Sequence, residues 1–85
     1  MKERSAVSIV VLERAFVYVG EVERDGDEIT IRNAKNIRRW GTTKGLGQLA
    51  LHGPQPRTAL DDAGTVRAPL SAVIHTIDCE AAAWK

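Results

Sequence analysis

The part of this 85-residue chain best suited to chemistry is residues 38–47, which read Arg-Arg-Trp-Gly-Thr-Thr-Lys-Gly-Leu-Gly. Guanidinium groups bind carboxylate or phosphate through paired hydrogen bonds. Backbone N–H groups at the start of a helix attract anions, and an indole ring offers a face on which a base can stack. The stretch therefore predicts a binding site for an anionic ligand. Its candidate residues are Arg38, Arg39, Trp40, Thr42, Thr43 and Lys44.

The same residues also have a purely structural interpretation. A solvated basic edge of a sheet, with Trp40 in the core, would produce the same pattern. Between these alternatives, we expect Trp40 to be mainly structural with an exposed edge. The arginines then carry whatever binding exists.

The charges of the chain are segregated along the sequence. Residues 29–60 contain no Asp or Glu but six basic side chains, whereas the remaining residues hold eleven acidic and six basic side chains. The net charge of +1 hides this asymmetry. A basic segment of this kind indicates an anionic partner. Nucleic acid is the less favoured partner, because the sequence pI of about 7.9 is below the strongly basic value typical of such domains.

No catalytic signature accompanies this segment. Residues 41–47 resemble a phosphate-binding loop, but they lack the glycine spacing and the Gly-Lys-Thr order of a Walker A motif. An active site needs a nucleophile, a base and an orienting group in one cleft, and the available residues form no such arrangement. We therefore predict a protein that is not an enzyme and that uses no cofactor. The residues considered for these roles are Ser71, His52, His75, Asp78 and Cys79.

Metal binding and membrane insertion are also not predicted. One cysteine and two histidines are too few for a zinc site built from these residues. Asp61 and Asp62 are interpreted as a turn rather than as ligands, His75 as a structural histidine, and Cys79 as a small buried thiol. No segment approaches the length of a membrane-spanning helix. A lone thiol fits a reducing compartment, and we predict a cytoplasmic protein.

Short β-branched runs separated by turn residues predict a mainly β (α+β) fold in a single domain, residues 1–85. It would be a small four- to five-stranded antiparallel sheet, or a partly open barrel, with one short helix. An Asp-Gly pair predicts a type I′ hairpin turn, and Thr42 or Thr43 is expected to cap the helix. The expected strands are 6–12, 15–23, 28–32 and 70–77, with a fifth, short edge strand at 64–68. An extended run is expected at 37–40, a connection at 55–62, a helix at 44–51 and a helical turn at 80–84.

The first two of these strands are apolar on both faces. A chain of 85 residues buries only about 60–65% of the surface that its unfolded chain exposes, so a second subunit or a closed barrel has to cover one face. We expect a homo-oligomer with Phe16, Val17 or Val19 at a subunit contact.

Several runs of the sequence resemble a family of small uncharacterised proteins of tailed phages and prophages. They are residues 18–22, the Asn-Ala-Lys-Asn-Ile-Arg-Arg-Trp run at 33–40, the Gly-Leu-Gly-Gln-Leu-Ala run at 45–50 with Gly53, and Ile-Asp-Cys at 77–79. The resemblance spans residues 15 to 79 and carries no catalytic residues. It implies a phage gene product acting in the bacterial cytoplasm.

Together these observations favour a phage-encoded, non-enzymatic binding protein that sequesters an anionic, nucleotide-type signal of host immunity. The alternatives are a nucleic-acid-binding protein and an inhibitor that covers an acidic surface of a host protein.

Overall fold

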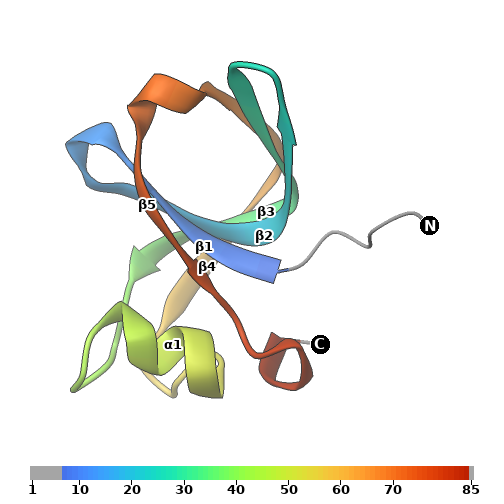
Figure 1. Cartoon of the computed structure of the whole chain (residues 1–85). Coiled ribbons are helices and arrows are strands. Elements are labelled where there is room, and N and C mark those ends of the chain that lie inside the picture. The colour runs from blue at the N-terminus through green and yellow to red at the C-terminus, as the bar shows by residue number, and fades with distance from the viewer. Residues whose placement is uncertain (1–6, 85) are drawn as a thin grey trace.

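The computed structural model describes residues 7–84 as one antiparallel sheet of five strands with a short helix. The strand order is β4-β3-β2-β1-β5, so β4 and β5 are the edge strands. The sheet curls strongly (Figure 1). This confirms the predicted mainly β fold with one helix. The elements are β1 (Val7–Leu12), η1 (Glu13–Ala15), β2 (Phe16–Asp25), β3 (Glu28–Arg39), α1 (Leu46–His52), β4 (Ala59–Pro69), η2 (Leu70–Ala72), β5 (Val73–Asp78) and η3 (Ala81–Trp84).

The apolar side chains form two clusters, one on each face of the curled sheet. Successive side chains of a strand point to opposite faces, and β1 accordingly contributes Ile9 to one cluster and Val10 to the other. The first cluster includes residues of α1 and is flanked by Trp84 of η3, so the helical segments cover that face. The second cluster contains only strand residues, so the curled sheet encloses it by itself.

This arrangement contradicts the prediction that Val17 or Val19 forms a subunit contact. Val17 and Val19 are only 4% and 2% exposed, because they pack beneath α1 within the same chain. They cannot form a subunit contact in this fold. Of the three residues expected there, only Phe16 lies on the surface, with 53% of its area exposed.

Gly20 and Asn33 allow β2 and β3 to bend together. The register between these strands shifts at Gly20, and Asn33 has a positive φ of 52° in β3. A Cβ on Gly20 would lie 2.7 Å from Ile31 Cγ2 and 2.8 Å from Arg32 O. The break expected at residues 33–36 is therefore a β-bulge, and β3 continues through it to Arg39.

The hairpin between β2 and β3 lies where the sequence predicts it, but its turn differs. Asp25 pairs with Glu28, which leaves Gly26 and Asp27 as the loop. Only Gly26 has a positive φ, at 62°. A type I′ turn needs a positive φ at both loop residues, so the turn follows the type II′ pattern.

The second half of the chain departs further from expectation. Residues 59–62, expected in an irregular connection, belong to β4 and pair with the end of β3. Helix α1 begins at Leu46 and its N-cap is Gly45, not a threonine. The expected last strand begins as the turn η2, and only residues from Val73 onward are extended. The helical turn at the C-terminus is confirmed as η3.

The C-terminal segment holds α1 against the sheet. Trp84 Nε1 donates a hydrogen bond to Leu49 O at 2.9 Å, and Glu80 N donates to Ala50 O at 2.8 Å. Gly53, with a φ of 81°, ends the helix where a Cβ would collide with the backbone of Ala83. The chain end is thus a structural part of the fold. Within residues 7–84, no helix is long and apolar enough to cross a membrane.

Candidate functional site

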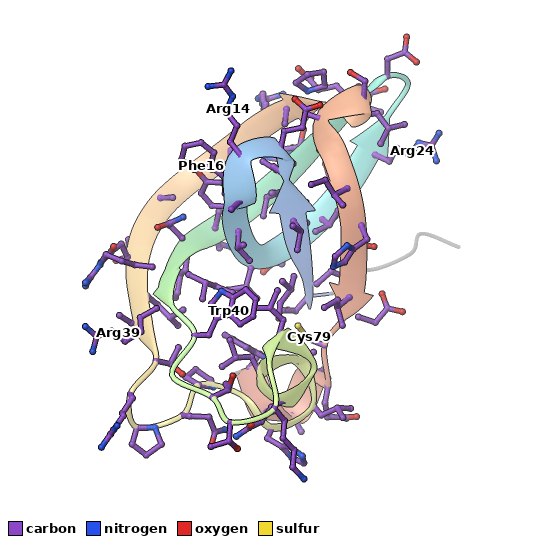
Figure 2. All side chains as sticks on the ribbon, turned by 90° about the vertical axis from the view of Figure 1, so that its left-hand side faces the viewer. Arg14, Phe16, Arg24, Arg39, Trp40 and Cys79 are labelled. Atoms are coloured by element: carbon purple, nitrogen blue, oxygen red, sulfur yellow. The ribbon has the colours of Figure 1, made fainter. Side chains whose placement is uncertain are left out.

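The six predicted site residues lie at the end of β3 and in the loop that leads to α1. Arg38 and Arg39 are the last two residues of β3, and the other four follow before the helix. Figure 2 shows Arg39 pointing outward from the fold, whereas Trp40 turns back toward the body of the molecule. The structure therefore keeps these residues together along the chain but directs them differently.

Arg38 is already occupied by an acidic partner. Its Nε donates to Asp61 Oδ2 at 2.8 Å and its Nη2 to Asp61 Oδ1 at 3.4 Å. This hydrogen bond raises the pKa of Arg38 above its ordinary value. A guanidinium that is bound by a carboxylate from its own chain is less available to an outside anion.

Half of the six basic side chains in the acid-free segment are paired with acids in three dimensions: Arg38, Lys35 and Arg32. Lys35 Nζ lies 2.6 Å from Asp62 Oδ1, and Arg32 Nη2 lies 3.2 Å from Glu23 Oε1. Hydrogen bonding with Lys35 lowers the pKa of Asp62. Antiparallel pairing with β2 and β4 brings acids from other segments beside these bases. Only part of the basic run in the sequence can therefore form a basic surface, and Asp61 and Asp62 lie in a strand rather than in the expected turn.

The backbone amides expected to bind an anion are satisfied by Gln48. The side-chain oxygen of Gln48 accepts hydrogen bonds from Thr43 N at 3.2 Å and Lys44 N at 2.9 Å, and it lies 3.4 Å from Thr43 Oγ1. Thr42 Oγ1 accepts a bond from Gly45 N at 3.0 Å. Both threonines thus stabilise the loop itself. Sequence reasoning missed Gln48, because its position in the first turn of a helix has no distinctive pattern.

Trp40 belongs to neither apolar cluster, and 43% of its surface is exposed. Its carbonyl oxygen accepts a hydrogen bond from Thr58 Oγ1 at 2.7 Å. The tryptophan that packs on a core is Trp84. The structural role that we expected for Trp40 thus falls to the other tryptophan of the chain.

Three basic side chains at this end of the molecule have no ion pair within residues 7–84. Arg39 pairs in register with Ala59, and the backbone of Gly41 lies against that of Arg57. Lys44 follows in the same loop. We call Arg39, Trp40, Lys44 and Arg57 the basic end of the molecule. Arg57 was not among the predicted site residues, because it is far from them in the sequence.

Three pockets among residues 7–84 lie away from the basic end. One of about 220 Å³ has Trp84 and Glu21 in its wall, one of about 270 Å³ lies between Asp62 and Gly64, and one of about 460 Å³ lies beside η2. Asn33 and Lys35 line both of the first two. No residue of the basic end lines these three pockets.

Two further residues that were considered for chemical roles are Cys79 and His75. Cys79 packs against the first apolar cluster, and desolvation by burial raises its pKa to about 11. A thiol with this pKa is a poor nucleophile near neutral pH. His75, interpreted from the sequence as structural, is instead exposed on β5.

The chain forms a small, strongly curled β-sheet protein with three exposed basic residues, Arg39, Lys44 and Arg57, in the segments that flank α1. Residues 5–85 match the model of a family described as "Domain of unknown function (DUF6948)", and the chain belongs to that family. No curated protein matches the chain. No solved structure matches it either.

Proposed function

We propose that this chain is a non-enzymatic binding protein that holds an anionic, phosphate-bearing ligand at its basic end. The observation that carries the proposal is the set of three basic side chains without an ion pair within residues 7–84, next to a half-exposed indole. Arginine binds phosphate through its planar fork, and lysine adds a mobile positive charge.

A nucleotide-type ligand fits this surface better than a simple inorganic anion. The base would stack on the exposed part of Trp40, a contact worth about 1–3 kcal/mol. The phosphates would lie toward Arg39, which pairs with Ala59, and toward Arg57, whose backbone lies against Gly41. The narrower form of the proposal is a phage protein that sequesters a nucleotide signal of host immunity. It rests on the sequence resemblance to phage proteins.

Calorimetry and thermal shift with cyclic dinucleotides and ADP-ribose derivatives at low salt test the proposal. We expect Arg39→Ala and Arg57→Ala each to weaken binding by about 1.5–3 kcal/mol, the range for a hydrogen bond to a charged group. Arg24→Ala is the matched control, because Arg24 is exposed, has no ion pair within residues 7–84 and lies in a different region (Figure 2). Equal affinity in all four proteins would refute the site.

Trp40→Ala separates stacking from stability. Since Trp40 is outside both clusters, we expect its loss to change the free energy of unfolding by at most about 1 kcal/mol while weakening binding. The unfolding free energy from urea titration provides the check. A loss of stability of about 3–5 kcal/mol would instead identify Trp40 as a core residue.

Single-stranded nucleic acid is the second candidate ligand. The observation that favours it is that the residues of the basic end line none of the three pockets above. A strand that follows basic side chains and stacks on an aromatic ring does not require an enclosed site. Binding would then fall linearly with the logarithm of salt concentration, with a slope set by the number of phosphates contacted. A mononucleotide that binds as tightly as an oligonucleotide would exclude this candidate.

A further inference from the structure

The two edge strands of the sheet differ in how well they are protected against pairing with another strand. Figure 2 shows β4 and β5 on opposite sides of the molecule, approaching each other only where η2 joins them. Each therefore leaves one row of backbone N–H and C=O groups unpaired within the sheet. Natural proteins protect such edges with charged side chains, glycine bulges and proline.

Strand β4 carries all three of these protective features, whereas β5 carries only one acidic residue, Asp78. The edge of β4 contains Asp61 and Asp62, a glycine with a positive φ at Gly64, and Pro69 at its end. Strand β5 reads Val-Ile-His-Thr-Ile-Asp, without lysine, arginine, glycine or proline. Its middle residues have high strand propensity and are exposed, and Ile74 at the register shift against β1 is 60% exposed.

The backbone of β5 has a definite polarity at its open edge. Cys79 N donates to Val7 O of β1 at 3.0 Å. Because N–H and C=O groups of alternate residues point to opposite sides of a strand, those of Ile77 also point toward β1. The N–H and C=O groups of Thr76 and Asp78 therefore point outward, where another strand can pair with them.

We propose that β5 pairs antiparallel with β5 of a second copy of this chain, about a twofold axis at Thr76. The outward groups of the two Thr76 residues then bond to each other, and His75 of each copy lies opposite Ile77 of the other. Cross-strand pairs of threonine are favourable. The two sheets become one continuous sheet with no open β5 edge.

A second copy suits this edge because the register brings no like charges together. The ionisable residues of β5 are His75 and Asp78, and neither faces itself across the axis. If two copies of β4 paired in the same way, each strand would bring two adjacent aspartates to the contact. The exposed Ile74 side chains add apolar area at both ends of the pairing. This dimer does not depend on the ligand proposed for the basic end.

Light scattering and sedimentation across a concentration series test the dimer. We expect a mass of about twice 9.3 kDa at high micromolar concentration. Thr76→Lys places two like charges opposite each other at the axis, and we expect the dissociation constant to rise roughly tenfold or more. Thr65→Lys is the matched control, since Thr65 is an exposed threonine on the other edge strand. Thr65→Lys should leave the dissociation constant of the dimer unchanged.

Thr76→Pro provides an independent variant, because proline removes only an N–H that points away from β1. Circular dichroism first establishes that each variant is folded. If Thr76→Pro does not fold, the test is decided by Thr76→Lys. In hydrogen exchange, the amides of Thr76 and Asp78 should become protected as concentration rises. A monomer at all concentrations, an assembly larger than a dimer, or a dimer equally sensitive to Thr65→Lys and Thr76→Lys would overturn the proposal.

Discussion

Gln48 shows how one residue can occupy a site that the sequence assigns to a ligand. Its side-chain oxygen accepts hydrogen bonds from two backbone N–H groups, those of Thr43 and Lys44, in the loop before α1. Backbone N–H groups in a loop before a helix need an acceptor, which a side chain, water or a ligand has to supply. Here the helix supplies the acceptor from its own first turn, so the loop needs no bound anion to be stable.

Replacing Gln48 with Ala should destabilise the protein by about 1–2 kcal/mol, the range for loss of a helix-capping side chain. Two amides lose their acceptor in the variant. Gln48→Glu keeps an oxygen acceptor and adds a negative charge near the start of the helix, so it should retain most of the stability. Urea unfolding of the three proteins measures these differences. Equal stability of the alanine and native proteins would show that water replaces the glutamine oxygen.

Cys79 should react slowly with alkylating agents below pH 9. Desolvation by burial is the main cause of its raised pKa of about 11, and the nearby charge of Asp78 also raises it. The folded protein therefore retains the thiol proton to higher pH than the unfolded chain. The Cys79 contribution to stability is complete below about pH 9 and is lost as pH rises toward 11. The pH dependence of iodoacetamide labelling, in native protein and in urea, measures both pKa values. Similar profiles in the two conditions would contradict the prediction.

The elements defined by local pattern were predictable, and those defined by distant partners were not. The β2–β3 hairpin follows from alternating apolar residues around a turn with glycine, and η3 was also predicted. Residues 59–62 look like a loop, because two aspartates follow a segment with two prolines. They are extended because β3 pairs with them through a register that also contains two ion pairs. Pairing of this kind overrides local propensity.

Glycines of the same chain should respond oppositely to alanine. At Gly20 a Cβ would collide with Ile31 and with the backbone of β3, so Gly20→Ala should cost about 1–3 kcal/mol, the range for overpacking. Gly47 lies in α1 with no atom within 4 Å of an added Cβ, so Gly47→Ala should stabilise by up to about 1 kcal/mol. Thermal unfolding compares the two variants with the native protein. A neutral Gly20→Ala would mean that β2 and β3 shift apart without cost.

At the scale of the molecule, the basic end contains a different set of residues from the site predicted by the sequence, because contacts between distant segments decide which basic side chains stay unpaired within residues 7–84. Sequence order correctly places Arg39, Trp40 and Lys44 together, but it cannot show that Arg38 faces Asp61 or that Arg57 lies beside Gly41. Both contacts depend on how the chain returns along β3 after α1. The predicted basic segment thus becomes a smaller basic end.

Asp61→Asn should strengthen binding of an anionic ligand. The substitution removes the carboxylate that holds Arg38, and an exposed ion pair of this kind contributes only about 0.2–1 kcal/mol to stability. Asp62→Asn is the control, because it makes the same change in net charge but releases Lys35, which lines two of the pockets instead. Calorimetric titration with the ligand found for the native protein compares the three. An equal gain in both variants would indicate a general effect of net charge.

The position of β1 in the sheet has a consequence for how the protein is made. This strand pairs on one side with β2, which follows it directly, and on the other with β5, near the end of the chain. During synthesis β1 emerges well before β5, so one edge of β1 stays unpaired until residues 73–78 have been translated. The sheet can therefore be completed only after β5 has been made. Such long-range closure is typical of slow-folding β proteins, and a nascent chain with its first strand half paired is a substrate suited to chaperones.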